Sequence, residues 1–189
     1  MFVSGSDEGR TLLFPRIIVR LGRLDLNDMT PQDAMQQALN LARQAAQSGD
    51  VPVGAVVLDS DGRIIGRGRN TREAHGDPLA HAEIIAMRDA VLSRDAERST
   101  AEQRELSLWN LSDCTLVVTL EPCPMCAGAC LQTHIGRVVF GAWDAKLGAC
   151  GSVWDILRDP HIGHTPQVVG GILESECAAL MTDFFASRR

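Results

Sequence analysis

Long hydrophobic runs and lysine are what this sequence most clearly lacks. No apolar stretch in its 189 residues approaches the roughly 18 residues that a membrane-spanning helix needs. The N-terminal region is not expected to act as a secretion signal, because the apolar stretch 12–21 is interrupted by Pro15, Arg16 and Arg20. These absences predict a cytoplasmic protein that has no membrane partner.

Among the 18 basic residues only Lys146 is a lysine, and 24 acidic residues bring the formal net charge to −6. This balance argues against a broad nucleic-acid-binding surface. It leaves room for a local basic patch, because net charge does not describe how the charges are distributed.

The six cysteines do not indicate the disulfide framework of a small secreted domain, because a chain of 189 residues can bury a sizeable core as one domain. Two of them form Cys123-x-x-Cys126, which in a reducing compartment is typical of metal binding or redox chemistry. The other four are expected to be small buried hydrophobic residues: Cys114, Cys130, Cys150 and Cys177.

The pattern along the chain predicts an N-terminal extension, residues 1–27, followed by one domain, residues 28–189. A first helix begins at Pro31 after the N-cap residue Thr30, carries Asp33 in its first turn and ends at Gly49.

The expected strands are 53–58, 64–65, 114–120, 138–141 and 167–170, with a hairpin turn at residues 61–62. Further helices are expected at 81–92, 126–133 and 174–187, with a short one around Trp154. Residues 70–78 are expected to form a polar loop, and the charged segment 93–103 a surface connector or a helix extension. Such alternation predicts a layered α/β sandwich with a mixed sheet.

Two short stretches carry the chemistry: His81-Ala-Glu83 and Pro122-Cys123-Pro-Met-Cys126. One imidazole and two thiolates can hold a zinc ion and leave its fourth position open for water, as in catalytic rather than structural zinc sites. Glu83 is then free to exchange protons with that water.

The spacing sets a geometric condition. Cys123 and Cys126 are three residues apart, so at a helix start both sulfurs lie on one side, where free N–H groups favour thiolates. His81 and Glu83 would point to nearly opposite sides of a regular helix, so His81 must lie at the very edge of its helix. We therefore expect two helix N-termini to converge at the ends of adjacent strands.

Two simpler interpretations use fewer of these residues. A redox pair would need only the two cysteines, and a structural zinc site would need a fourth ligand, for which Cys114, Cys130, Cys150 and His134 are candidates. Neither interpretation uses Glu83. The joint pattern, His-x-Glu followed about forty residues later by Pro-Cys-x-x-Cys, is the signature of the zinc nucleobase deaminases.

At these residues the chain resembles the cytidine/deoxycytidylate deaminase superfamily and, within it, the bacterial tRNA-specific adenosine deaminases. The resemblance extends from about residue 30 to the C-terminus and includes the stretches 51–55, 77–83, 119–129, 135–142, 144–146, 176–180 and 183–185. It implies a three-layer α/β/α cytidine-deaminase-like sandwich with a mixed five-stranded sheet, and a single zinc-dependent deaminase domain over residues 28–189. The extension 1–27 and the long connector 93–103 are departures from the family pattern.

The resemblance also implies an activity and a site. It implies hydrolytic deamination of adenosine to inosine at the wobble position of a tRNA anticodon, that of an arginine tRNA, by a homodimer with one Zn²⁺ per subunit. Glu83 would be catalytic, the metal ligands would be His81, Cys123 and Cys126, and the substrate would be bound by Asn70, Ala82, Asp144, Lys146, Phe185 and Arg189. A deaminase of a free nucleobase or nucleoside, such as guanine or cytosine, remains the alternative, and a structural zinc module is the non-enzymatic one.

Overall fold

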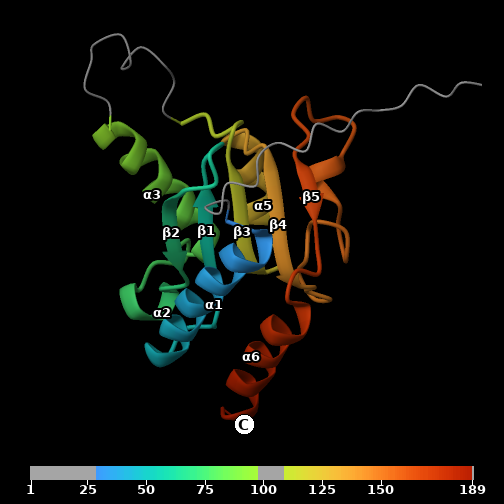
Figure 1. The fold of residues 1–189 in the computed structure, drawn as a ribbon. Helices are drawn as coiled ribbons and strands as arrows, with labels where there is room; N and C mark the ends of the chain where they lie inside the picture. The colour runs from blue at the N-terminus through green and yellow to red at the C-terminus, as the bar shows by residue number, and fades with distance from the viewer. Residues whose placement is uncertain (1–28, 98–108, 189) are drawn as a thin grey trace, which may run out of the picture.

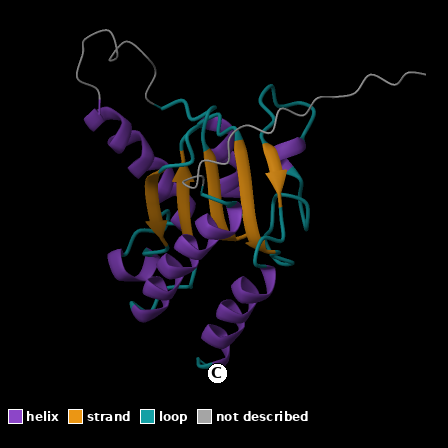
Figure 2. Cartoon of the chain, viewed as in Figure 1, coloured by secondary structure: helices purple, strands orange, loops and turns teal. Residues whose placement is uncertain are grey.

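The computed structural model describes residues 29–97 and 109–188 of the chain. Its centre is a five-stranded sheet of order β2-β1-β3-β4-β5, visible edge to edge in Figures 1 and 2. The strands are β1 (Gly54–Leu58), β2 (Ile64–Arg69), β3 (Thr115–Leu120), β4 (Arg137–Ala142) and β5 (Gln167–Val169). The helices are α1 (Pro31–Gln47), α2 (Arg72–His75), α3 (Ala82–Glu97), α5 (Pro124–Gln132) and α6 (Glu174–Ala186), with a 3-10 turn η1 (Ile156–Arg158). The expected extension 1–27 and residues 98–103 of the expected connector lie outside the described residues.

The sheet is mixed, as the sequence predicted. β1 runs antiparallel to both of its neighbours, β2 and β3, whereas β3, β4 and β5 are parallel to one another. The β1–β2 hairpin turns at Gly62, whose φ of 77° suits glycine. The parallel pair β3–β4 is joined through α5, as a parallel connection requires.

Helices cover both faces of the sheet, so the three-layer prediction is confirmed (Figure 1). On one face, α1 and α6 pack on a buried cluster that includes Met35, Leu39 and Val117. On the other face, α3 and α5 enclose a larger cluster that includes Leu116 and Phe140. Every residue of β1 is buried, because both of its faces are covered.

Helix α1 begins where its local sequence predicts. The Thr30 hydroxyl accepts a hydrogen bond from the Asp33 N–H, and the Asp33 carboxylate accepts one from the Thr30 N–H, which completes a capping box. Pro31 occupies the first turn. These bonds satisfy N–H groups that a helix start leaves without partners.

Three local expectations differ from the structure. The loop expected over 70–78 contains the short helix α2, which ends at Gly76 in the left-handed region. Helix α5 begins at Pro124, two residues before the expected start, because Cys123 is its N-cap and proline fits the first turn. The short helix expected around Trp154 is η1, which begins at Ile156.

Helix α3 extends beyond the expected end at residue 92 to Glu97, so the start of the connector continues the helix. Within the described ranges, no helix combines the length and apolar character needed to cross a bilayer.

Candidate zinc site

Two helix starts meet at one end of the sheet, as the spacing of the motifs required. His81 immediately precedes α3, and its carbonyl accepts the first hydrogen bond of that helix from the Ile85 N–H at 3.1 Å. Cys123 is the N-cap of α5, and Cys126 lies in the first turn of that helix. The prediction that His81 sits at the edge of its helix is confirmed.

The expectation that the two helix N-termini converge at the ends of adjacent strands is wrong. Both helices follow strands that end at the same edge of the sheet, β2 and β3, but β1 lies between these two strands. Because β1 is antiparallel to each of them, its first residues occupy the gap between the two strand ends. The convergence therefore spans three strands.

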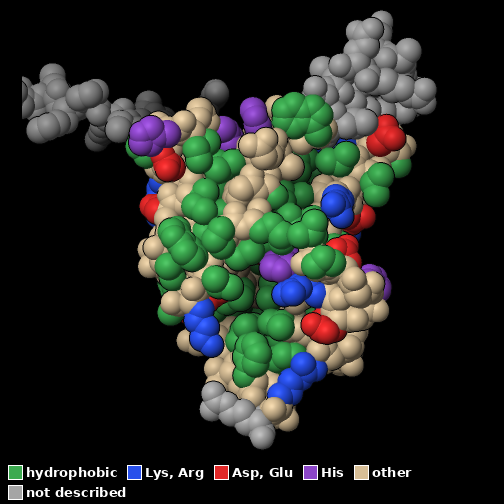
Figure 3. Space-filling model, turned by 180° about the vertical axis from the view of Figure 1, so that it is seen from behind, with side chains coloured by type: hydrophobic (Ala, Val, Ile, Leu, Met, Phe, Trp, Pro, Cys, Tyr) green, Lys and Arg blue, Asp and Glu red, His purple; other side chains and the backbone are tan. Residues whose placement is uncertain are grey.

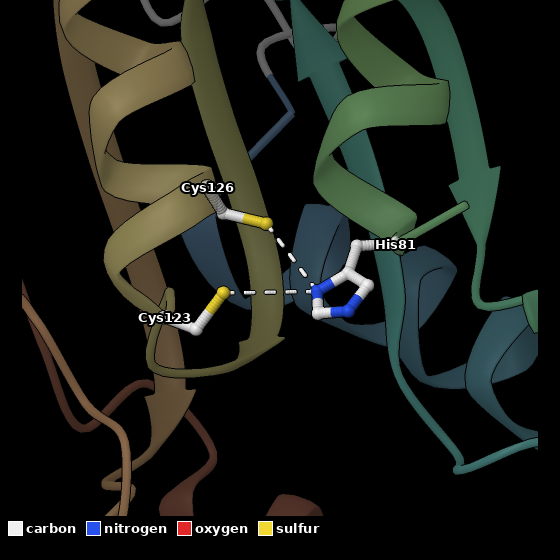
Figure 4. Close-up of side chains that lie close together, drawn as sticks. All are labelled: His81, Cys123 and Cys126. Carbon is white, nitrogen blue, oxygen red and sulfur yellow. Dashed lines mark hydrogen bonds between the residues drawn. The ribbon is translucent and has the colours of Figure 1, made fainter. Parts of the chain in front are cut away.

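The three ligand atoms lie within one coordination sphere (Figure 4). The Nδ1 of His81 is 3.7 Å from the Cys123 Sγ and 3.5 Å from the Cys126 Sγ, and all three atoms lie within 4.8 Å of one another. A tetrahedral zinc ion about 2.3 Å from sulfur and about 2.0 Å from nitrogen would separate these atoms by about 3.5 Å. The residues present therefore fit zinc.

In the described part of the chain, this trio is the one group of histidine, cysteine and acidic side chains that could hold a metal. Cys114, Cys130, Cys150 and His134, the fourth-ligand candidates, are not part of it. A site with three protein ligands matches the catalytic rather than the structural class of zinc site.

The protonation of the two thiols suits a metal. A hydrogen bond from the Cys126 thiol lowers the pKa of Cys123 to about 4, with a smaller lowering contribution from His81. The same bond raises the pKa of Cys126. A zinc ion binds cysteine as the thiolate, so metal binding here releases the remaining thiol proton.

Glu83 lies in the first turn of α3 and is only 4% exposed. Burial raises the pKa of its carboxyl to about 7, against the lowering effect of a backbone hydrogen bond and the His81 charge. Cys126 is close enough to hydrogen-bond this carboxyl, so the acid lies beside the metal ligands. A buried carboxyl that gains and loses its proton near neutral pH is suited to general acid–base chemistry.

Two expected substrate-binding residues lie on the stretch that leads from β2 into α3: Asn70 directly follows β2, and Ala82 directly follows His81. Asn70 is buried; its side-chain N–H donates to the Val51 carbonyl at 3.3 Å and its oxygen accepts from the Arg72 N–H at 3.3 Å. Each end of the amide keeps one further bonding position. Ala82 is the first residue of α3, where helix N–H groups have no intrahelical acceptor.

The other expected RNA-contact residues lie near the C-terminal helix. Lys146 and Phe185, both exposed, line one surface hollow together with Thr182, Ala186 and Arg188. The Asp144 carboxylate accepts from the Lys146 and Leu147 N–H groups, so it orders the turn that presents Lys146. Arg189 lies outside the described residues.

The two neighbouring aromatic rings of α6 differ in burial. Phe184 is 8% exposed, whereas Phe185 is 48% exposed. The Arg188 guanidinium lies 4.0 Å over the Phe184 ring and donates to the Gly49 carbonyl at 2.6 Å. Phe184 and Arg188 therefore anchor the end of α6 to the end of α1, which leaves Phe185 facing outward.

Sequence reasoning gave no role to two buried carboxylates. Asp50 accepts hydrogen bonds from the Glu73 and Ala74 N–H groups and so caps α2. Glu121 accepts from three N–H groups of the segment that follows β4. The position of Glu121 next to Pro122-Cys123 was the available signal, whereas nothing in the sequence near Asp50 points to α2.

A zinc-binding trio that leaves one position for water, beside a buried carboxyl, defines a site for hydrolysis at a metal. Residues 29–142 match the family model described as "cytidine and deoxycytidylate deaminase zinc-binding region". The chain belongs to this family.

Two relatives show how the likeness is distributed. The tRNA(Ile)-lysidine synthase of Deinococcus radiodurans is 50% identical over 156 residues, which are 82% of this chain but 25% of that protein. The chain thus spans about a quarter of that relative. The tRNA-specific adenosine deaminase of Haemophilus influenzae is 43% identical over 155 residues, which are 82% of this chain and 83% of that enzyme.

A solved structure is similar over the same region. It comes from a study of A-to-I editing by tRNA:A34 deaminases at the wobble position of transfer RNA, and it superposes with a TM-score of 0.68 at 38% identity. The match covers 78% of this chain and 97% of that one. The cytidine-deaminase-like fold predicted from the sequence is confirmed.

The ligand set predicts a specific response to cysteine substitution. Cys126→Ala should reduce bound zinc from one per chain to less than about a tenth, because two remaining ligands cannot compete with solvent and chelators. Metal analysis after dialysis against a weak chelator measures this. Cys130→Ala is the matched control, since it removes a buried thiol from the next turn of α5 and should keep the metal. Equal zinc in both variants would contradict the assignment.

Proposed function

We propose that this protein deaminates adenosine to inosine at the wobble position of a tRNA anticodon. The observation that carries the proposal is the meeting of His81, Cys123 and Cys126 beside the buried carboxyl of Glu83. The likeness to the H. influenzae enzyme over most of both chains supports RNA as the substrate. We further propose an arginine tRNA as the acceptor and the cytoplasm as the place of reaction.

The reaction is hydrolytic: water adds at C6 of adenine and ammonia leaves. When bound, zinc lowers the pKa of a water molecule so that it loses a proton near neutral pH. Glu83 accepts that proton at its carboxylate, delivers it to the ring nitrogen and then assists departure of the amino group. The burial that holds the pKa of Glu83 near 7 lets one carboxyl both take and return a proton.

The target base has to leave its stack to reach this buried carboxyl, which costs least in a single-stranded loop. We propose that Asn70 and the Ala82 N–H hold the flipped base, using the bonding positions that their present contacts leave free. Asp144, Lys146 and Phe185 would contact the neighbouring nucleotides along the hollow beside α6. Arg189 is proposed to lie next to the same RNA.

We also propose that the chain forms a homodimer through the face that carries α3 and α5. Figure 3 shows hydrophobic side chains gathered across the middle of this face. The two helices of this face carry the partly buried Ile84, Val91 and Ala129, and Leu92 of α3 is 68% exposed. An apolar area of this kind is typical of protein interfaces. Sedimentation velocity should give twice the 20.4 kDa of one chain, and a monomer at micromolar concentration would contradict it.

Substituting the proposed proton carrier separates chemistry from metal binding. Glu83→Gln should keep one zinc per chain and lower the deamination rate by about 10²–10⁴-fold, because the amide cannot carry the proton. Ammonia release is measured with an anticodon stem-loop and, in parallel, with guanine, cytosine and adenosine. Asp61→Asn, at the exposed β1–β2 turn, is the control. Activity on a free base alone would make the alternative, a free-base deaminase, the better description.

Lys146 tests the RNA surface. Lys146→Met should raise KM for the stem-loop about three- to tenfold and reduce the dependence of log Kd on log salt concentration by about 0.7–0.9, because one phosphate contact is lost. Titrations at several salt concentrations measure both. The control, Arg63→Met, removes an exposed cation from the far end of the sheet and should change neither. Identical salt slopes for the two variants would remove Lys146 from the proposed surface.

A further inference from the structure

Glu121 joins the cysteine segment to the segment that carries Asp144 and Lys146. It is 2% exposed and lies between the end of β3 and Pro122. Its Oε2 accepts from the Asp144 N–H at 3.0 Å, and its Oε1 accepts from the N–H groups of Cys150 and Ser152 at 2.9 and 3.1 Å. One buried carboxylate thus contacts both ends of the segment 144–152.

This segment has little regular structure of its own. The Ala149 N–H also donates to the Pro122 carbonyl at 2.8 Å, which gives a second link to the cysteine segment. On its other side the segment is bonded to η1, through the Ile156 N–H to the Ala149 carbonyl at 3.0 Å and the Arg158 guanidinium to the Cys150 carbonyl at 3.2 Å. A Cβ on Gly148 would overlap Glu121 and Ser152, so the backbone packs directly on the carboxylate. The direct hydrogen bonds between this segment and the cysteine segment thus come from Glu121 and Pro122, the two residues before Cys123.

We propose that Glu121 is a positioning residue for substrate recognition. It holds Lys146 at a defined place relative to the zinc ligands, so that RNA bound along the α6 hollow delivers its base to Glu83. This inference rests on the proposed function. Glu121 itself does not touch the RNA in this arrangement, because its oxygens are buried and bonded to backbone N–H groups.

The chemistry of the carboxylate suits this task. Three N–H donors reach its two oxygens, and a carboxylate carries acceptors only. In Glu121→Gln one oxygen becomes an NH₂ group, which can only donate. This group then faces at least one backbone N–H of the segment, which cannot accept a hydrogen bond. The shape of the side chain is kept, while at least one of the three bonds that orient the segment is lost.

The first test compares Glu121→Gln with wild type and with Asp59→Asn. Asp59 is the matched control, because its carboxylate also accepts two backbone N–H bonds, in the β1–β2 turn at the far end of the sheet. Glu121→Gln should keep its zinc and raise both KM and Kd for the stem-loop by about three- to tenfold, because misplacing Lys146 costs at most about as much as removing its phosphate contact. Asp59→Asn should change neither value. Loss of zinc in Glu121→Gln, or equal values for the two variants, would overturn the proposal.

A double-mutant cycle shows whether the effect of Glu121→Gln on RNA binding passes through Lys146. If Glu121 acts through Lys146, then Glu121→Gln should raise Kd much less in the Lys146→Met background than in wild type. Equal fold-changes in both backgrounds would overturn the inference. A wild-type protein that binds the stem-loop without deaminating it would instead contradict the proposed function, and the Kd cycle would still be measurable.

Amide hydrogen exchange tests the structural step without depending on any variant. In the wild-type protein, the amides of Asp144, Cys150 and Ser152 should exchange far more slowly than those of the neighbouring exposed residues, because Glu121 holds them. Rapid exchange at all three would overturn the proposal even if Glu121→Gln failed to fold.

Discussion

The site depends on a close approach between helix and sheet. For His81 to reach the sulfurs of a segment 42 residues further along the chain, α3 has to lie against β2 at a fixed height. Gly66 and Gly68 of β2 make this possible, because a Cβ on either would overlap the backbone of α3 at Ala86 or Ala82. Small residues on both elements bring the helix close to the strand, and His81 lies immediately before the first residue of that helix.

The order of the strands completes this arrangement. β1 separates β2 from β3, so His81 and the cysteines approach from either side of an antiparallel strand. Gly54, at the start of β1, lets α1 pack on the opposite face, where a Cβ would overlap the Ala38 carbonyl. Close packing on both faces leaves little freedom at this end of the sheet. The three ligand atoms are then held within 4.8 Å of one another.

The features that could be predicted from the sequence depend on bonds between neighbouring residues or on the restricted chemistry of zinc ligands. The capping box at Thr30 and Asp33 involves residues three apart, so the start of α1 was readable. The zinc ligands were readable because few residue types bind zinc and their spacing is restrictive. The condition on His81 followed from helix geometry alone, and the structure meets it.

What could not be predicted depends on contacts between distant segments. Helix α2 is capped by Asp50, 23 and 24 residues before the N–H groups that it accepts. A loop with so few apolar residues gives no periodic signal for a helix. The separation of β2 from β3 is a property of the whole sheet, and no pattern within either strand encodes it. The role of Glu121 is equally remote, since its partners lie 23 to 31 residues away.

Asp50 and Glu121 follow one physical rule on the two sides of the zinc ligands. Each is a buried carboxylate that accepts N–H groups from a segment outside the sheet: Asp50 from α2, and Glu121 from the segment that carries Asp144 and Lys146. Burying a carboxylate costs free energy unless its oxygens accept hydrogen bonds. The buried carboxylate and the fixed conformation of the segment that donates to it therefore depend on each other. The acidic residues that give this chain its net charge of −6 thus include two that act within the protein. Both accept backbone N–H groups, whereas Lys146 and Phe185, the proposed RNA contacts, are exposed.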